Sequence, residues 1–425
     1  MRIAFTTLGC KINQFETDVL RRDFESRGNT IVPFNAEADV YIINTCTVTA
    51  KSDYQCRQVI RSAIRRGLGA KVVVTGCYAE LQPDEIKKVH GVDLVFGNRE
   101  KNRIPELLTA AFPTSLNGEI LGVDNRTAQA VHRRTREFLK IQDGCNNRCS
   151  YCIVPLARGR SRSVPVQEVR QSFKRLVQAG YAEIVLTGIH IGTYGSDLCT
   201  GINLTELLKM LLLERGSARI RLSSIEPGEV TQELIGFLGK GLCRHLHVPL
   251  QSGDDAILAS MKRNYSSGFY RELLENIAKQ VPGIALGADV MVGFPGEGDQ
   301  EFQNTMRFVK ESHLTHLHVF SYSSRPGTTA ADMKAQVTEG AKKERSAALR
   351  KLARDKNLLF REMHIGARLT VVVEDKVDAR TGVLTGLTDN YIRVHISAAK
   401  QEHISEKISV RISHVNEQEN FAEIL

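Results

Sequence analysis

Short apolar runs alternate with amphipathic stretches over the first quarter of the chain. Runs rich in Val, Ile and Phe predict strands at 2–7, 30–34, 39–44, 71–75 and 92–96. Apolar positions at helical spacing predict helices over 14–27, 50–66 and 101–112. Because strands that alternate with helices usually pair in parallel, this region is expected to form an α/β domain around a parallel sheet.

The same alternation returns between residues 138 and 330. The predicted strands lie at 138–142, 183–187, 219–224, 245–249, 286–292 and 315–322. The predicted helices lie near 165–179, 204–215, 230–240, 254–261, 267–280 and 299–311. Six strand–helix units in a row are typical of a β/α barrel or partial barrel, whose site lies at the carboxyl ends of the strands.

The pattern changes again near the C-terminus. A long basic helix is predicted over 338–364, and short strands between 367 and 425 indicate a small antiparallel β-barrel. Residues 113–137 are polar, as expected of a linker. We therefore expect a protein of the α/β class with three domains, at 1–125, 131–364 and 365–425.

Composition excludes two classes of protein. The chain has 425 residues, of which 42% are hydrophobic, and this suits several globular cores. No stretch approaches the roughly 20 apolar residues of a membrane helix, and the N-terminus lacks the long apolar run of a signal peptide. Nine cysteines, an odd number, are not typical of a disulfide framework. We expect a cytosolic protein without a membrane partner, whose reduced cysteines serve metal binding or catalysis.

The net charge of +9 is concentrated in one segment. Residues 126–175 contain twelve Lys or Arg and three Asp or Glu, so the rest of the chain is neutral overall. Such a stripe is typical of a surface that contacts a phosphate backbone, although a solvated helix and loop face has the same pattern. The candidate RNA-binding residues are Arg133, Arg134, Arg136, Arg158 and Arg160. Residues 365–425 carry seven basic and nine acidic side chains, so any RNA contact there would be local.

A compact cysteine motif follows the first strand of the predicted barrel. Cys145, Cys149 and Cys152 form a C-x3-C-x2-C run, which offers three thiolates to a 4Fe–4S cluster and leaves its fourth iron open. An open iron at the mouth of a barrel can bind a small molecule directly. A structural zinc site would need a fourth ligand at close spacing, and the run has none beside it.

Three further cysteines occupy equivalent positions after predicted strands. Cys10, Cys46 and Cys77 each stand one or two residues beyond a strand of the N-terminal sheet. The carboxyl ends of parallel strands lie along one edge, so these thiols are expected to converge there and to hold a second cluster with one open iron. The thiols that lack such a placement, and are expected to be ordinary, are Cys56, Cys199 and Cys243.

The C-x3-C-x2-C run on the first strand–helix loop resembles the radical S-adenosylmethionine superfamily. The resemblance implies that S-adenosylmethionine chelates the open iron and is cleaved there to a 5′-deoxyadenosyl radical. Segments at the later strand ends also resemble this superfamily. The residues to which the resemblance assigns cofactor binding are Tyr151, Gly188, Ser224, Glu226, Gln251, Asp289 and Gly293. The chain departs from the common Gly-Gly-Glu form between Thr187 and Gly195, so the residue that binds the cofactor amine stays open.

The two cysteine sets, the parallel sheet, the barrel and the C-terminal β-domain together resemble the methylthiotransferases over nearly the whole chain. The resemblance implies two 4Fe–4S clusters, S-adenosylmethionine, a tRNA substrate and a TRAM-like RNA-binding barrel. It makes all six cysteines catalytic, with Cys10, Cys46 and Cys77 holding an auxiliary cluster that carries the transferred sulfur. An electron donor and a sulfur source would then come from outside the protein.

Local sequence points to one branch of that family. Lys11 after the first cysteine and Thr47 after the second resemble the MtaB type, which acts on threonylcarbamoyladenosine at position 37 of tRNA. Other branches act on isopentenyladenosine in tRNA and on an aspartate of a ribosomal protein. The threonylcarbamoyl group carries a carboxylate, and the arginines expected to bind it, unless they contact phosphates instead, are Arg158, Arg160 and Arg162. Two rival interpretations are a non-catalytic iron–sulfur RNA-binding protein and a radical methyltransferase acting on RNA.

Overall fold

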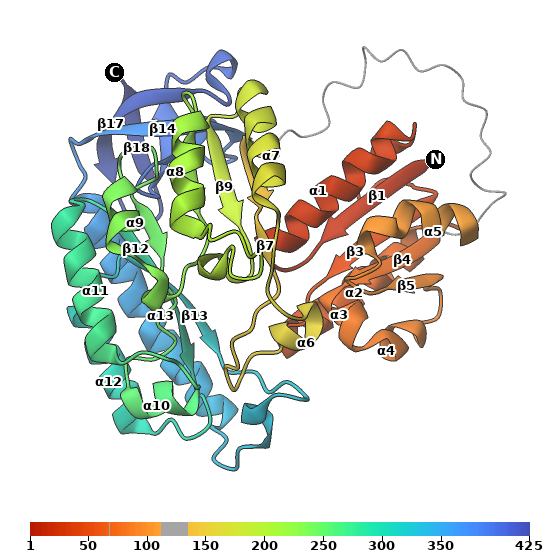
Figure 1. The fold of residues 1–425 in the computed structure, drawn as a ribbon, viewed down its shortest axis with the longest axis horizontal. Coiled ribbons are helices and arrows are strands. Elements are labelled where there is room, and N and C mark those ends of the chain that lie inside the picture. Colours follow the sequence, from red (N-terminus) through yellow and green to blue (C-terminus); the bar gives the residue numbers. More distant parts are fainter. Residues whose placement is uncertain (68, 112–134) are drawn as a thin grey trace.

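The protein is described by a computed structural model that covers residues 1–67, 69–111 and 135–425. Figure 1 shows three bodies: an N-terminal sheet with its helices, a large central body, and a C-terminal barrel of strands. The expected linker falls mostly on residues 112–134, outside the described residues. Within the described ranges, no helix is both long enough and apolar enough to cross a membrane.

The N-terminal body is built on a five-stranded parallel sheet in the order β2-β1-β3-β4-β5. Its strands are β1 (Arg2–Thr7), β2 (Thr30–Val32), β3 (Val40–Thr45), β4 (Lys71–Gly76) and β5 (Leu94–Phe96). Its helices are α1 (Lys11–Ser26), α2 (Ala50–Arg66), α3 (Cys77–Leu81), α4 (Pro83–Lys87) and α5 (Ile104–Ala111). The predicted parallel α/β sheet is confirmed.

Alternation along the central strand β3 explains why helices cover both faces of this sheet. Tyr41 and Ile43 belong to one core cluster together with Ile60 of α2. Ile42 belongs to the other cluster together with Phe24 of α1. Successive side chains of a strand point to opposite faces, so an apolar run buried on both sides needs a helix on each side.

The central body is a partial barrel of two three-stranded parallel sheets. One sheet contains β6 (Arg136–Lys140), β9 (Glu183–Thr187) and β10 (Arg219–Leu222). The other contains β11 (His245–His247), β12 (Ala285–Val292) and β13 (His316–Ser321). A hydrogen bond of 3.0 Å from the Ile225 amide to the His247 carbonyl joins the two sheets beyond the ends of β10 and β11. The six predicted strand–helix units are therefore present.

Helices surround this partial barrel, and a short hairpin and helix lie at its mouth. The outer helices are α7 (Val166–Gln178), α8 (Leu204–Glu214), α9 (Gln232–Phe237), α10 (Asp255–Ser260), α11 (Ser267–Gln280) and α12 (Asp299–Glu311). The mouth carries β7 (Gln142–Asp143), α6 (Val154–Arg158) and β8 (Arg162–Ser163). The long helix α13 (Glu339–Glu362) then leads to the C-terminal barrel.

The C-terminal barrel differs from the expected one in two respects. It contains β14 (Arg368–Val377), β15 (Leu384–Thr388), β16 (Arg393–Ser397), β17 (Lys407–Val415) and an unpredicted fifth strand, β18 (Asn420–Ile424). The sheet closes in the order β14-β15-β16-β18-β17, and β16 pairs with β18 in parallel. A closed ring with an odd number of strands cannot be antiparallel at every step, so one parallel pair is required.

This barrel is fixed to the central body by two buried arginines. Arg219 donates hydrogen bonds to the carbonyls of Thr370 and Leu387, at 2.9 and 2.7 Å. Arg221 donates to the Thr388 carbonyl at 2.9 Å, and both arginines pair with the buried carboxylate of Glu183. Arg219 and Glu183 begin their strands, so the C-terminal barrel covers the amino ends of β9 and β10. The carboxyl ends stay available for a site.

Candidate active site

The loop after β6 and β7 presents the first cysteine set at the mouth of the partial barrel. The Cys145 amide donates to the Gly159 carbonyl at 3.1 Å, and the Ser150 amide donates to the Met261 carbonyl at 3.1 Å. Burial, together with the neighbouring Cys149 and Cys145 thiols, raises the pKa of Cys152 to about 12. A thiolate at such a position needs strong positive charge beside it, which the iron of a cluster supplies.

The second cysteine set lies at the carboxyl edge of the N-terminal sheet. Cys10 follows β1, Cys46 follows β3, and Cys77 opens α3 directly after β4. Gly9 lies so close to Cys46 that a Cβ on it would stand 2.7 Å from the Cys46 Cβ. Burial raises the pKa values of Cys10 and Cys46, and the three thiols act electrostatically on one another. The structure thus brings together three cysteines that are 36 and 31 residues apart in sequence.

Neither cysteine set is spaced for a single metal ion. Tetrahedral zinc with Zn–S bonds of about 2.3 Å places its sulfurs about 3.8 Å apart. In the described part of the chain, the only three His, Cys, Asp or Glu residues whose ligand atoms all lie within 4.8 Å of one another are His247, Asp289 and His318. In each cysteine set at least one pair of sulfurs therefore lies more than 4.8 Å apart, as suits a cluster in which each thiolate binds a different iron.

Helix α6 connects the two cysteine sets. It follows Cys152, and its last residue, Arg158, lies close enough to Cys10 for its charge to oppose the rise in that thiol's pKa that burial causes. The Asn98 side-chain amide donates to the Ala157 carbonyl at 2.8 Å and lies 3.6 Å from the Cys77 Sγ. Figure 1 shows α6 between the N-terminal sheet and the central body. The two sets therefore share one interdomain boundary.

The expectation that Arg158 binds RNA phosphate or a substrate carboxylate is wrong in this structure. Its guanidinium is buried, with Nη1 2.8 Å from Glu16 Oε1 and 3.1 Å from Asp143 Oδ1. Nη2 donates to Asn13 Oδ1 at 2.5 Å. A buried guanidinium needs carboxylate partners to offset the loss of hydration, and Arg158 has two, from α1 and from β7.

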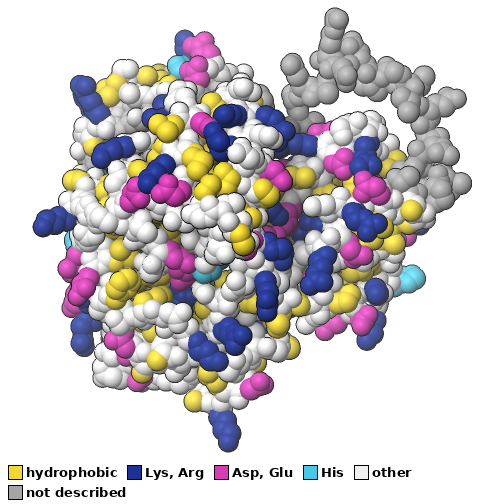
Figure 2. All heavy atoms as spheres, in the orientation of Figure 1, with side chains coloured by type: hydrophobic (Ala, Val, Ile, Leu, Met, Phe, Trp, Pro, Cys, Tyr) yellow, Lys and Arg dark blue, Asp and Glu magenta, His cyan; other side chains and the backbone are white. Residues whose placement is uncertain are grey.

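The basic stripe does not form one continuous surface. Arg136 lies 2.8 Å from the Glu374 carboxylate and 3.6 Å from Glu183, so it too is occupied by acidic partners. Arg160 is exposed at the mouth, whereas Arg133 and Arg134 lie outside the described residues. Figure 2 shows Lys and Arg interspersed with Asp and Glu over this face. The exposed cations in the described part of the stripe are those of the cluster region, such as Arg160, and Lys174 and Arg175 of α7.

A cavity beside the first cysteine set contains groups that fit the polar end of S-adenosylmethionine. Cys149, Glu226, Glu229 and Arg263 line it together with Tyr265. Arg263 Nη1 lies 3.4 Å from the Cys149 Sγ, and Nη2 pairs with Glu226. Carboxylates beside an open iron suit the cofactor's ammonium, and a guanidinium suits its carboxylate.

His190 joins this cavity to the cluster loop. Its Nε2 lies 2.6 Å from Glu229 Oε1, and its Nδ1 lies 3.4 Å from the Cys145 Sγ. Burial lowers the pKa of His190, but its interactions with Cys145 and Glu229 outweigh this and raise the pKa to about 10. His190 lies in the segment that replaces the common Gly-Gly-Glu form.

Of the seven expected cofactor residues, one lines this cavity, and three others have surroundings that can be described beside it. Glu226 lines it, and Ser224 is exposed. Tyr151 packs against the apolar cluster that contains Met291. Gln251 is buried with φ +65°, and its Oε1 has no hydrogen-bond partner among the described residues. Such an orphaned acceptor fits a bound ligand that supplies a donor.

The other three expected cofactor residues are in different surroundings. A Cβ on Gly188 would stand 2.9 Å from Gln142 Oε1, so this turn packs against the cluster loop. Gly293 packs against the Lys342 side chain, because a Cβ added to Gly293 would stand 2.3 Å from Lys342 Cγ. Asp289 lies within β12, before its carboxyl end, and its carboxylate binds two histidines instead of lining the cavity beside Cys149.

Sequence reasoning missed several residues that the structure brings to the site. They are Lys11, His190, Glu229, Arg263, His247 and His318. The sequence did contain a signal for His247 and His318, because His-Leu-His occurs at both 245–247 and 316–318. Alternate residues of a strand share a face, so two such segments in one barrel predict four histidines on facing surfaces.

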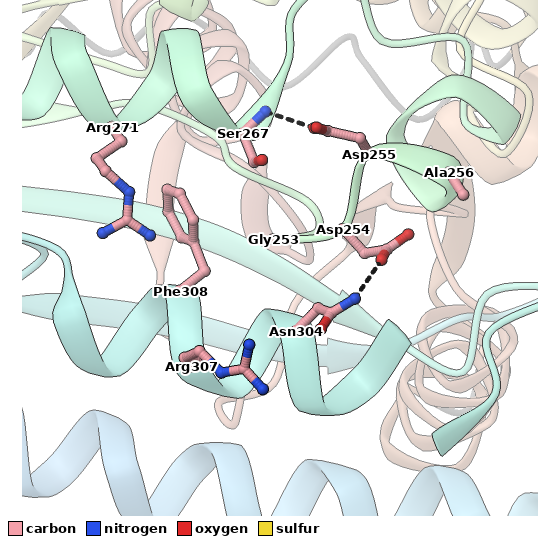
Figure 3. A pocket seen from close by; sticks show the side chains of 9 residues that line it. All are labelled: Gly253, Asp254, Asp255, Ala256, Ser267, Arg271, Asn304, Arg307 and Phe308. Atoms are coloured by element: carbon pink, nitrogen blue, oxygen red, sulfur yellow. Dashed lines mark hydrogen bonds between the residues drawn. The ribbon is translucent and has the colours of Figure 1, made fainter. Parts of the chain in front are cut away.

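A separate hollow on the outer surface is remote from this chemistry. Figure 3 shows it between α10, α11 and α12, with the Asn304 amide donating to Asp254 Oδ2 at 2.8 Å. Arg271 and Arg307 face it, but none of the nine cysteines lines it. It therefore takes no part in the candidate site.

Comparison with known proteins agrees with this arrangement. Residues 2–97 match the family described as uncharacterized protein family UPF0004, and residues 139–309 match the radical SAM superfamily. The solved radical S-adenosylmethionine methyltransferase TsrM from Kitasatospora setae aligns with a TM-score of 0.58 at 17% identity, over 78% of this chain and 77% of that one. At that identity the likeness concerns the fold alone.

Two curated relatives cover nearly the whole chain. Threonylcarbamoyladenosine tRNA methylthiotransferase MtaB of Bacillus subtilis is 40% identical over 96% of this chain and 93% of its own length. The protein of the same name from Aquifex aeolicus is 38% identical over 94% of this chain and 98% of its own length. The chain therefore belongs to the MtaB-type methylthiotransferases of the radical S-adenosylmethionine superfamily.

Proposed function

We propose that this protein converts N6-threonylcarbamoyladenosine at position 37 of tRNA to its 2-methylthio derivative, using S-adenosylmethionine and two 4Fe–4S clusters. The observation that carries the proposal is the pair of cysteine sets joined by α6 across one domain boundary. The names of the curated relatives support the tRNA substrate and its threonylcarbamoyl group.

The two cysteine sets divide the chemistry between them. When bound, the clusters and S-adenosylmethionine supply the electron, the radical and the sulfur that the reaction needs. Cys145, Cys149 and Cys152 would hold the cluster at the barrel mouth, beside the cavity that contains Glu226 and Arg263. Cys10, Cys46 and Cys77 would hold the auxiliary cluster on the facing edge of the N-terminal sheet. An external electron donor and an external sulfur source complete the proposal.

The residues of the cavity would orient the cofactor. Glu229 would accept hydrogen bonds from its ammonium, and Arg263 would donate to its carboxylate. His190 holds Glu229 in place through its Nε2. The apolar cluster around Tyr151, Met291 and Phe294 would pack against the adenine and keep water away. Through these contacts the protein would contribute orientation of the cofactor and exclusion of side reactions.

The reconstituted enzyme tests this proposal when it is offered three tRNAs, carrying threonylcarbamoyladenosine, isopentenyladenosine or unmodified adenosine. Methylthiolated nucleoside, measured by mass spectrometry, is expected only with the first. Cys149→Ala should abolish product, whereas Cys56→Ala, at a buried thiol outside both sets, should retain it.

Three results would contradict the proposal. Equal turnover of the isopentenyl tRNA would change the substrate and leave the enzyme class intact. Methylthiolation of a ribosomal protein instead of tRNA would contradict the proposal that the substrate is tRNA. Failure to cleave S-adenosylmethionine under reducing conditions would favour a non-catalytic iron–sulfur RNA-binding protein.

A further inference from the structure

Four histidines face one another between two strands of the central body. His245 and His247 come from β11, and His316 and His318 come from β13. The rings of His245 and His316 stack with centroids 5.4 Å apart, and those of His247 and His318 stack at 5.0 Å. Gly287 of β12 lies between them, and a Cβ there would stand 2.2 Å from His316 Nε2. Because glycine has no side chain, residue 287 leaves room for the histidine rings.

Asp289 holds two of these histidines in one orientation. Its Oδ1 lies 3.0 Å from His247 Nε2 and 3.2 Å from His318 Nδ1. Burial opposes ionisation, but the hydrogen bonds from both histidines lower the pKa of Asp289 below its usual value. Because Nδ1 of His318 is held by Asp289, its Nε2 is the ring nitrogen left for a ligand. The side chain of His318 is 64% exposed, so a ligand has access to it.

Lys11 brings a cation to the same region from the N-terminal body. It directly follows Cys10, begins α1, and is partly buried. The charges that act on its ammonium are those of Arg221, Arg136, Glu183 and Asp289, which lie on β10, β6, β9 and β12 of the partial barrel. Lys11 therefore lies next to the auxiliary cysteine set and within electrostatic reach of the strands of the partial barrel.

The ammonium of Lys11 has no ion-pair partner of its own. Glu183 is already paired with Arg219 and Arg221, and Asp289 is held by two histidines. In the described part of the chain, Lys11 Nζ forms neither a hydrogen bond nor a salt bridge. The charges of Glu183 and Asp289 offset part of the hydration that this partly buried ammonium loses, but no carboxylate pairs with it directly. An anionic ligand would supply the missing partner.

We propose that Lys11 and the His247–Asp289–His318 group bind the carboxylate-bearing substituent on N6 of the adenosine substrate. In this arrangement the ammonium pairs with the carboxylate, and His318 Nε2 accepts a hydrogen bond from a polar hydrogen of the substituent. The inference rests on the proposed function and adds the residues that select the substrate. It also places the substituent one residue from Cys10, so recognition and the proposed sulfur carrier lie side by side.

A divalent cation is the rival occupant of the His247–Asp289–His318 group, because two imidazoles and a carboxylate are common metal ligands. The surrounding charge argues against it. Lys11 and Arg221 both lie within electrostatic reach of this region, and a dication would add to their repulsion. An anion is favoured by the same charges.

The test compares two substrates that differ at one group. A tRNA anticodon stem-loop would carry threonylcarbamoyladenosine or its analogue in which the threonine carboxylate is a carboxamide. The wild-type holoenzyme should prefer the carboxylate in kcat/KM by about tenfold to a hundredfold, as for a hydrogen-bonded charge. Lys11→Met should reduce this preference to a few-fold, and Lys11→Arg should restore part of it. Lys51→Met, at an exposed lysine of the same domain, should keep the wild-type preference.

Three results would each contradict a different claim. A carboxylate preference that persists in Lys11→Met, in a variant with the full iron content, would overturn this inference alone. A wild-type enzyme that turns over neither substrate would overturn the proposed function, and this inference with it. One equivalent of Zn²⁺ or Mn²⁺ bound by the wild type and lost in Asp289→Asn would make the group a metal site instead.

Discussion

Arg158 is the most constrained charged residue at the boundary between the two cysteine sets. Its guanidinium touches Glu16 of α1 and Asp143 of β7. Lys140 pairs with both carboxylates, and Glu16 also pairs with Lys101. Because the contacts cross from one body to the other, Arg158 holds the auxiliary set in register with the barrel mouth. Replacing Arg158 is therefore expected to lower the stability of the folded protein rather than to weaken ligand binding directly.

Replacing Arg158 by Met should therefore destabilise the protein by about 3–5 kcal/mol, because it leaves buried carboxylates without their arginine. The measurement is urea unfolding of the reconstituted enzyme, followed through the transition of the N-terminal body. Arg160→Met, at an exposed position two residues on, should cost less than about 1 kcal/mol. A similar cost for both variants would mean that the buried network contributes little.

The ionisation of Glu16 makes this boundary sensitive to acid. Burial raises the pKa of Glu16, but Lys101 and Arg158 outweigh it, so the pKa lies below its ordinary value of 4.5. A carboxylate with a depressed folded pKa contributes stability above its unfolded pKa and loses it as the pH falls toward the folded pKa. The wild type should lose stability below about pH 4.5, and Glu16→Gln should show a flatter dependence. Parallel curves for the two proteins would contradict this assignment.

At the scale of single elements, the loop between β7 and β8 carries the exposed positive charge of the site. Arg148 lies between Cys145 and Cys149, Arg160 follows the set, and Arg162 begins β8; all three are exposed. Arg170 and Lys174 of α7 instead share the Glu214 carboxylate. Arg148 and Arg160 have no acidic partner among the described residues, and the exposed Arg162 donates only to the carbonyls of Arg158 and Arg160. Helix α7 instead presents an ion pair.

Changing Arg148, Arg160 and Arg162 to Ala together should flatten the salt dependence of tRNA affinity. Each lost phosphate contact lowers the slope of log affinity against log salt by about 0.7–0.9, so the expected change is about two units. The matched pair Arg170→Ala and Lys174→Ala should leave the slope close to that of the wild type. Filter binding from about 50 to 200 mM salt measures it. An unchanged slope in the triple variant would show that this loop is only a solvated face.

Sequence patterns anticipated the elements better than the contacts between them. Strand and helix periodicity is local, so the parallel sheet, the partial barrel and the strand-end positions of Cys10, Cys46 and Cys77 could be expected. The partners of Arg158 could not, because Glu16 lies 142 residues away in sequence. Strand β18 was missed because Asn420–Ile424 is short and only partly apolar, and its pairing depends on closure of the barrel.

At the scale of the whole molecule, the C-terminal barrel and the N-terminal sheet lie at opposite ends of the partial barrel. The C-terminal barrel closes the amino ends of β9 and β10 through Arg219 and Arg221. The N-terminal sheet meets the opposite mouth, where Arg325 of the segment after β13 pairs with Asp53 at 2.5 Å. The two cysteine sets therefore lie at the mouth of the partial barrel, and the C-terminal barrel covers its opposite end.

The separation of the two cysteine sets is the central claim, and iron content together with product analysis tests it most directly. The wild type should bind about eight irons per chain, four for each cluster. Cys46→Ala should keep about four, still cleave S-adenosylmethionine to 5′-deoxyadenosine, and form no methylthiolated tRNA. Cys149→Ala should lose both reactions. Methylthiolated product from Cys46→Ala at the wild-type rate, or a wild type that binds only one cluster's worth of iron, would contradict the account.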